Sequence, residues 1–171
     1  MAKNIKYILC CMLLLMCAAC SIKYSFNGSS IDYTKIKTFT IKDFPNQAAL
    51  VYPPLSQEFT EALKDIFTRQ TRLTSVNNNG DLELEGAIVG YELTPMAVKE
   101  DAYASQTRLT ITVKVTFTNR VDPDQDFTDQ SFSAYREFSA DKLLQDVQAE
   151  LCEEIIDEIV DQIYNSTVAN W

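Results

Sequence analysis

The sequence predicts an α+β fold, a two-layer sandwich in which two helices pack on one face of a four-stranded, mostly antiparallel sheet. The stretch Arg108–Asn119 alternates between apolar and hydroxylated or charged side chains. Two other stretches, Leu55–Phe67 and Leu144–Ile163, repeat apolar residues three and four positions apart. Strands send successive side chains to opposite faces, whereas helices bring residues three and four apart onto one face. The three stretches therefore indicate one half-buried strand and two amphipathic helices.

The N-terminus has the composition of a secretory signal. Lys3 and Lys6 precede a short apolar run, Tyr7–Met16, which leads to small residues. A helix needs about 20 apolar residues to span a bilayer core of about 30 Å, so this run is too short to cross one. We therefore predict that residues 1–19 are a signal peptide.

The end of this signal resembles a bacterial lipobox, in which the chain is cut before a cysteine that is then acylated. Ala18 and Ala19 precede Cys20, although Cys17 occupies a position where leucine is usual. We predict that Cys20 is lipidated, because several acyl chains at about 0.8 kcal/mol per buried methylene form a stable anchor. Ser21 is typical of an outer-membrane lipoprotein that faces the periplasm. The alternative is an ordinary signal cleaved near Ala19, which would release a soluble secreted protein.

The mature chain has the size and charge of one acidic domain. Removing residues 1–19 takes away two lysines and no acidic residue, which leaves a formal charge near −11. Net charge alone would hold such a chain neither to nucleic acid nor to an anionic membrane surface. We predict a polar lipidated tether at residues 20–30 and a single α/β domain at residues 31–171.

The sequence of the first half of this domain predicts a strand, a helix and a turn. Apolar residues of one parity indicate a strand over Tyr33–Lys42, which turn-forming residues 43–46 end. Two prolines precede the apolar stripe of Leu55–Phe67, and proline costs little in the first turn of a helix. The run Asn77–Gly80 then predicts a turn.

The second half predicts an antiparallel meander of three strands. In Asp81–Leu93 the apolar parity shifts at Gly90, which indicates a bulge or sharp bend there. Pro95 is expected to end that strand and to lie in a loop over Thr94–Gln106. The central strand Arg108–Asn119 follows, and a turn leads into a fourth, aromatic strand over Asp126–Phe138.

A long helix is predicted over Ala140–Tyr164. Cys152 lies within its apolar stripe, which indicates a buried, inert thiol. We interpret the acidic residues outside the stripe as a solvated face rather than a divalent-cation site, because no loop arranges their oxygens. Those residues are Asp146, Glu150, Glu153, Glu154, Asp157, Glu158 and Asp161.

The order strand, helix, strand, strand, strand, helix leaves one sheet face without a cover. Two helices can both pack on the apolar face of the sheet. The polar residues of the central strand then stay exposed and form the predicted partner-facing surface. They are Thr110, Thr112, Lys114, Thr116 and Thr118.

The composition argues against catalysis. The chain has no histidine, which removes the commonest general base near neutral pH and the commonest zinc ligand. It has four glycines, no glycine-rich phosphate loop and no G-x-S-x-G elbow. We therefore predict no enzymatic activity, no catalytic residues, no metal site and no cofactor.

The mature chain also contains a set of segments that is specific as a group. They are Phe44–Asn46, Leu55–Phe67, Thr71–Leu73, Gly80–Tyr91, Arg108–Asn119, Asp124–Phe138 and Val168–Trp171. Together they resemble the LptE family of lipopolysaccharide-assembly lipoproteins, in its Bacteroidetes branch. The resemblance spans nearly all of the mature chain, and none of the segments is a catalytic signature.

The resemblance implies an outer-membrane lipoprotein with a two-layer α/β domain. Its expected partner is the large β-barrel LptD, in whose lumen the lipoprotein sits as a plug. It would assist assembly of the barrel and passage of lipopolysaccharide to the outer leaflet. A barrel lumen is polar, which suits the threonine-rich face, although many antiparallel sheets simply expose one face to water.

Direct binding of lipopolysaccharide would require a local basic cluster, because both ligand and protein are anionic. The candidates are Lys99, Arg108, Lys114 and Arg120, although two acidic residues follow Lys99 directly. We expect the barrel to supply most of the recognition. The alternative function is a periplasm-facing envelope lipoprotein that binds another protein and has no lipopolysaccharide ligand. The terminal Trp171 is interpreted as a residue that packs on its own domain, and the alternative is a contact with a neighbouring protein.

Overall fold

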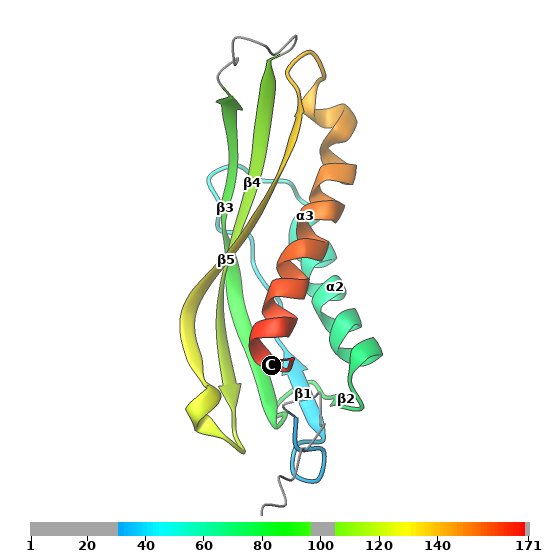
Figure 1. Cartoon of the computed structure of the whole chain (residues 1–171), viewed down its shortest axis with the longest axis vertical. Coiled ribbons are helices and arrows are strands. Elements are labelled where there is room, and N and C mark those ends of the chain that lie inside the picture. Colours follow the sequence, from blue (N-terminus) through cyan, green and yellow to red (C-terminus); the bar gives the residue numbers. More distant parts are fainter. Residues whose placement is uncertain (1–30, 97–104, 170–171) are drawn as a thin grey trace, which may run out of the picture.

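The computed structural model describes residues 31–96 and 105–169. Both helices lie on one side of a single sheet (Figure 1), which makes a two-layer α+β sandwich. The elements in chain order are β1 (Thr38–Ile41), α2 (Leu55–Gln70), β2 (Thr74–Ser75), β3 (Leu82–Met96), β4 (Gln106–Asn119), the 3₁₀ turn η2 (Pro123–Gln125), β5 (Phe127–Ser139) and α3 (Leu144–Thr167). The predicted signal peptide, Cys20, the tether, Lys99 and Trp171 lie outside the described residues.

The sheet has five strands in the order β2-β1-β3-β4-β5 and is mixed. β3, β4 and β5 form the predicted antiparallel meander, whereas β1 pairs in parallel with both β2 and β3. The prediction of four strands is therefore wrong, because β2 has only two residues, too few to show a periodicity. β1 runs parallel to β3 because α2 lies between them in the chain and makes the crossover that parallel strands require.

Several element ends differ from the sequence prediction. β1 begins at Thr38 rather than Tyr33, because the Ile36 N–H donates to the Asp32 carbonyl at 2.9 Å and closes a turn. α3 runs over Leu144–Thr167, a few residues later than predicted. In the described part of the chain, neither helix combines the length and the apolar composition needed to cross a membrane.

β3 continues past the proline that was expected to end it. The register places Pro95 opposite Thr107, and the strand runs on to Met96. A proline is tolerated in a strand where its nitrogen, which lacks a hydrogen, faces an open edge. The predicted irregularity near Gly90 is confirmed by a register shift between Ile88 and Gly90.

The core lies between the sheet and the helices. The apolar row of β4 is at most 1% exposed, which confirms its predicted parity. That row is Leu109, Ile111, Val113, Val115 and Phe117. The ring of Phe67 on α2 packs against Phe39 of β1 and Tyr164 of α3, with centroids 5.6 Å apart in both pairs. Burial of each large apolar side chain contributes roughly 2 kcal/mol, so this layer is the main source of stability.

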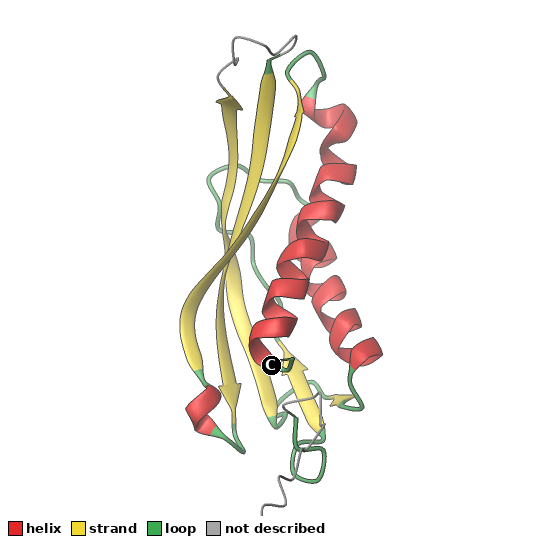
Figure 2. Ribbon diagram, viewed as in Figure 1, coloured by secondary structure: helices red, strands yellow, loops and turns green. Residues whose placement is uncertain are grey.

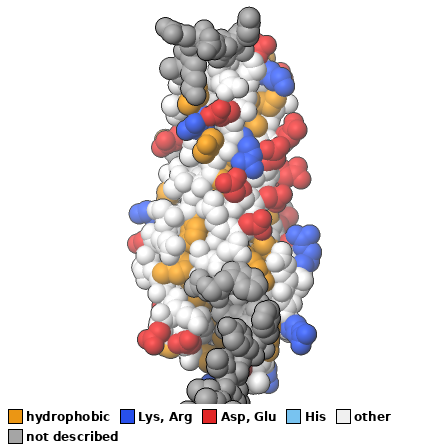
Figure 3. All heavy atoms as spheres, in the orientation of Figure 1, with side chains coloured by type: hydrophobic (Ala, Val, Ile, Leu, Met, Phe, Trp, Pro, Cys, Tyr) orange, Lys and Arg blue, Asp and Glu red, His pale blue; other side chains and the backbone are white. Residues whose placement is uncertain are grey.

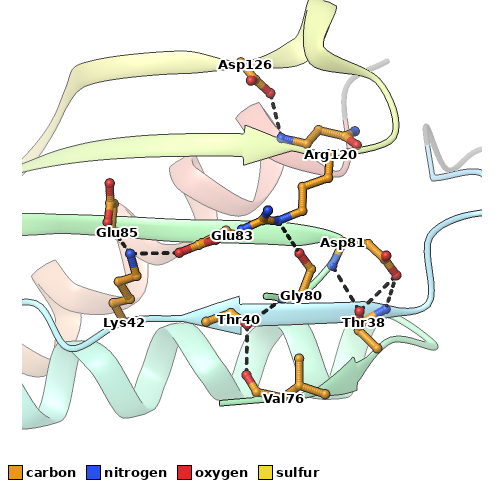
Figure 4. Close-up of polar contacts among 11 residues, drawn as sticks. Thr38, Thr40, Lys42, Val76, Gly80, Asp81, Glu83, Glu85, Arg120 and Asp126 are labelled. Atoms are coloured by element: carbon orange, nitrogen blue, oxygen red, sulfur yellow. Dashed lines mark hydrogen bonds and ion pairs between the residues drawn. The ribbon is translucent and has the colours of Figure 1, made fainter. Parts of the chain in front are cut away.

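Asp81 joins the start of β1 to the start of β3 (Figure 4). Its carboxylate accepts hydrogen bonds from the Lys37 N–H at 2.8 Å and from the N–H and hydroxyl of Thr38 at 2.9 Å. The Asp81 N–H in turn donates to the Thr38 hydroxyl at 3.0 Å. The backbone hydrogen bond from Lys37 is the largest cause of the lowered pKa of Asp81.

We predict that Asp81→Ala lowers the free energy of unfolding at pH 7 by about 1–2 kcal/mol, because it removes hydrogen bonds to a charged acceptor. The folded-state pKa lies below the unfolded one, so this stabilisation is present above the unfolded pKa and is lost as pH falls through the folded pKa. Urea unfolding from pH 7 to pH 3 should show the difference between wild type and variant narrowing with acidity. Asp65→Ala, at an exposed position of α2, is the control; an equal loss in both variants would contradict the assignment.

Cys152 is fully buried on α3, as predicted. Its sulfur lies 4.0 Å from the Tyr91 hydroxyl, to which Gln148 donates at 2.6 Å. Burial raises the pKa of the Cys152 thiol to about 11. The thiol is therefore protonated at neutral pH and shielded from solvent.

We expect Cys152 to resist a thiol reagent such as Ellman's reagent in the folded protein at pH 8 and to react fully in 6–8 M urea, about the range that unfolds small domains. The measurement uses a chain of residues 20–171 that carries Cys20→Ser, so that Cys152 is the one cysteine counted. Introducing Val121→Cys at an exposed position supplies a thiol that reacts at once. Rapid reaction of native Cys152 would show that this part of the core opens readily.

Candidate functional site

The candidate site is the sheet surface opposite the helices, which we call the open face. Neither α2 nor α3 lies on this side of β3, β4 and β5 (Figure 2). Its central row comes from β4, where four threonines are half-buried and one lysine is exposed. The row is Thr110, Thr112, Lys114, Thr116 and Thr118, so the fold brings the predicted surface together on one face.

The neighbouring strands place small and hydroxylated side chains at the centre of the open face. Across β5, the residues opposite Thr110, Thr112 and Lys114 are Tyr135, Ser133 and Ser131. Across β3, the residues opposite Thr112 and Lys114 are Gly90 and Ala87. Hydroxyls can both donate and accept hydrogen bonds, so such a face adapts to many polar partners.

Most of these threonine hydroxyls are available to water or to a partner. Within the described residues, only Thr116 uses its hydroxyl in an intramolecular hydrogen bond, which it accepts from the Asp129 N–H at 3.2 Å. Asp129 has a positive φ of 52° at the point where β5 shifts its register against β4. Thr116 therefore supports the irregular end of β5, whereas the other threonines have no structural bond to lose.

An ion-pair network covers one end of the open face (Figure 4). The Lys42 ammonium lies 2.8 Å from Glu83 and 2.6 Å from Glu85, and the Arg120 guanidinium lies 2.6 Å from Glu83. Arg120 also donates to the Gly80 carbonyl at 3.0 Å. The hydrogen bonds from Lys42 and Arg120 hold the pKa of Glu83 below its ordinary value. The charge of Arg120 is therefore compensated within the domain.

Arg108 is compensated at the opposite end of the face. Its guanidinium donates to Glu137 at 2.6 Å and lies 4.0 Å from the centroid of the Tyr135 ring. The carboxylate and the ring together hold the arginine in one orientation. Tyr135 remains 50% exposed, so it presents a rigid aromatic surface beside the threonine row.

Lys114 is the one candidate cation, among those that the structure describes, without an ion-pair partner in the described residues. It borders a shallow hollow of about 430 Å³ between the start of the β1–α2 connection and the irregular end of β5. Residues that line the hollow include Lys42, Glu85, Ala87, Val89, Lys114 and Asp129. The hollow thus mixes both signs of charge and has no strong preference for an anion.

The three described candidate cations do not lie close together. Strands rise about 3.3 Å per residue, so Arg108 and Arg120 each lie about 20 Å from Lys114 along β4. Lys99 lies outside the described residues. No single anionic group could therefore contact two of the described candidates at once.

The sequence prediction missed the acidic and aromatic partners of these cations. Glu83 and Glu137 come from the two flanking strands, and Lys42 follows β1. The alternation of apolar and polar residues in β3 and β5 indicates which face each side chain is on. Which cation meets which carboxylate depends on the cross-strand register. The two β-bulges make that register impossible to count from the sequence alone.

The acidic charge of the domain gathers on the helix side, along α3 (Figure 3). Arg136 of β5 contacts two of these carboxylates, Glu154 at 2.7 Å and Glu158 at 2.6 Å. The described residues contain no group of acidic or cysteine side chains arranged to hold a metal ion. The two sides of the sandwich therefore differ: one is acidic, and the other is hydroxylated and close to neutral.

Residues 36–167 match the family model described as LptE, lipopolysaccharide-assembly. The chain belongs to the LptE family. The match confirms the family that the sequence segments resemble, and it indicates no enzymatic family; the Bacteroidetes branch stays a prediction. A comparison with curated protein sequences finds no significant match.

Several solved structures are similar to this chain at low sequence identity. A neuraminyllactose-binding hemagglutinin homolog from Helicobacter pylori has a TM-score of 0.51 and 10% identity, over 75% of this chain and 81% of that one. A hypothetical protein from Chlamydia trachomatis has a TM-score of 0.50 and 11% identity, over 79% and 99%. The rare lipoprotein B of Shewanella oneidensis has a TM-score of 0.49 and 13% identity, over 76% and 92%.

Proposed function

We propose that this LptE-family protein is anchored in the outer membrane through Cys20 and faces the periplasm. In this proposal it occupies the lumen of a large LptD-like β-barrel as a plug. It supports assembly of the barrel and helps lipopolysaccharide reach the outer leaflet. This proposal is based on the membership of the chain in a lipopolysaccharide-assembly family.

The open face is the observation that carries the plug proposal. A surface inside a barrel must match a polar wall, and burying uncompensated charge there would be costly. The row from Thr110 to Thr118 offers short hydroxylated side chains, and the cations at its two ends are paired within the domain. Such a face can be buried against a polar wall with few unpaired charges.

The same compensation limits the part that this domain plays in holding lipopolysaccharide. Arg108 and Arg120 each have a carboxylate partner at 2.6 Å, so neither offers a free positive charge. We propose that the barrel supplies most of the lipopolysaccharide recognition and that Lys114 makes a secondary contribution. The second candidate function, a periplasm-facing protein-interaction module without a lipopolysaccharide ligand, draws support from this same shortage of free cations.

A pull-down from detergent-solubilised outer membranes tests the proposal, using a tagged full-length chain with Cys20 intact. Recovery of one large β-barrel protein in stoichiometric amount is the expected result. Recovery of the lipoprotein alone, or with a soluble periplasmic protein, would contradict the plug function and favour the interaction module. A Cys20→Ala chain separates the contribution of the anchor from that of the domain.

We predict that Thr112→Arg sharply reduces recovery of the barrel, because it places a long uncompensated cation in the centre of the open face. Thr68→Arg, at an exposed position of α2 on the helix side, is the matched control and should leave recovery unchanged. Thermal unfolding of both variants should resemble wild type, since Thr68 is exposed and the Thr112 side chain lies on the open face, outside the core. Equal recovery with Thr112→Arg and Thr68→Arg would remove the open face as the barrel contact.

Reversing Lys114 tests direct lipopolysaccharide contact. One lysine near an anionic surface contributes about 1 kcal/mol, so Lys114→Glu should weaken capture by the purified domain about fivefold or more at low salt. Lys142→Glu makes the same charge change in the turn before α3 and should have little effect. If both variants capture lipopolysaccharide like wild type, this domain has no direct contact centred on Lys114.

A further inference from the structure

The two long edges of the sheet are protected to different degrees. An unpaired strand edge presents backbone N–H and C=O groups that can pair with another chain. At the β5 edge, Gln162 donates to the Ser133 carbonyl at 3.4 Å and Arg136 donates to the Tyr135 carbonyl at 2.8 Å. Glu154 and Glu158 of α3 hold Arg136 in place, so the middle of this edge is blocked by side chains.

The opposite edge, on β3, is covered only along its first half. There β1 pairs with Leu82–Leu84, and the Lys42 N–H donates to the Leu84 carbonyl at 2.9 Å. The chain then follows β3 as far as Ile88, which donates to the Pro45 carbonyl at 3.0 Å and accepts from the Gln47 N–H at 2.8 Å. Beyond this point the chain leaves the edge to reach α2 (Figure 1).

The second half of β3 keeps outward-facing backbone groups. Both backbone groups of Ile88 point away from β4, and such groups alternate along a strand. The bulge inserts Val89, so the outward positions after it are odd-numbered and include Leu93 and Pro95. Within the described residues, no backbone group bonds to Leu93 from outside the sheet. Pro95 has no N–H to offer, so pairing beyond it is restricted.

Exposed aliphatic side chains concentrate at this same edge. Leu93 and Val89 of β3 are each 36% exposed, and Leu50 and Val51 of the β1–α2 connection are 51% and 64% exposed. The hydrogen bond from Gln47 to Ile88 holds the start of this connection beside β3. The free backbone edge itself carries the exposed side chain of Leu93.

We propose that the β3 edge at Glu92–Pro95 pairs with a short extended segment of the partner barrel, which adds a strand to the sheet. The inference rests on the proposed plug function and specifies a contact that the open face does not include. The partner segment carries an aliphatic residue on the helix side, against Leu93. On the other side it carries a lysine or arginine that faces Glu92, whose side chain lies on the open face.

A second copy of this chain fits the edge less well. Antiparallel pairing of two β3 edges around Leu93 would bring two Glu92 carboxylates onto the same side, and like charges near each other are unfavourable in a sheet. Each mature chain also carries a formal charge near −11, which opposes self-association. The edge therefore favours a partner with basic residues.

Cross-linking in the purified lipoprotein–barrel complex tests the edge. A photoreactive amino acid replaces Leu93, and the control replaces Val121, which is 37% exposed and lies in the turn after β4. Position 93 is expected to cross-link to one short segment of the barrel with an aliphatic residue and a lysine or arginine, and position 121 is not expected to reach that segment. Cross-links from position 93 to a second copy of the lipoprotein, or none to the barrel, would overturn the proposal.

Two substitutions at Leu93 separate the contribution of its backbone N–H to barrel binding from the contribution of its side chain. Leu93→Pro removes an outward-facing N–H and leaves the groups that pair with β4, whereas Leu93→Thr also loses the leucine side chain but keeps that N–H. We expect Leu93→Pro to reduce recovery of the complex about fivefold relative to Leu93→Thr, the effect of about one hydrogen bond. Circular dichroism and thermal unfolding confirm that both variants fold. Equal recovery would overturn the proposal.

Amide exchange in the wild-type protein gives the same test without a substitution. The Leu93 amide should exchange quickly in the isolated domain and slowly in the complex, whereas the β4-paired amide of Glu92 should be protected in both. An intact complex with fast exchange at Leu93 would overturn the edge contact and leave the plug function standing. Failure to recover any complex with the wild-type chain would overturn both the edge contact and the plug function.

Discussion

The two-faced character of β4 is the constraint on which the rest of this structure depends. From Leu109 onward its odd-numbered residues are almost completely buried, and its even-numbered residues from Arg108 to Thr118 are hydroxylated or charged. Because alternation along a strand is obligatory, burying one row commits the other row to the opposite side. The helices must then lie on the apolar side, and the open face follows from the same packing that makes the core.

This arrangement separates the charges of the domain. The helix side carries the acidic surface of α3, while the open face balances most of its charges across strands. Cross-strand ion pairs on an exposed face contribute little stability, so their main effect is on how the surface appears to a partner. A face of this kind can meet a polar wall without leaving strong charges unpaired, whereas an acidic helix side repels an anionic lipid.

The edges of the sheet add a second level of specificity. Side chains from α3 and Arg136 block carbonyls of β5, and the chain itself covers the first half of β3. A short stretch of β3 beyond its bulge stays open and carries the exposed Leu93. A strand added there would lie beside Glu92, whose carboxylate favours a basic residue on the added strand.

The sequence by itself determined the elements that bury an apolar stripe or row: α2, α3, β4 and the antiparallel meander. It also determined the bulge near Gly90 and the threonine row, because each of these is a local pattern of period two or a break in it. Recognition of the family likewise needed only local segments. Elements without a local pattern, such as the two-residue β2 and the late start of β1, were not predictable in this way.

Only the tertiary structure decided which charges are free. Arg108 and Arg120 look like equal candidates in the sequence, yet Glu137 and Glu83 neutralise them from other strands, and only the register brings those residues together. Pro95 likewise predicts the end of a strand from the sequence, whereas the fold places it within β3 at an open edge. In both cases the deciding quantity is the distance between residues far apart in the chain, which a pattern along one strand does not contain.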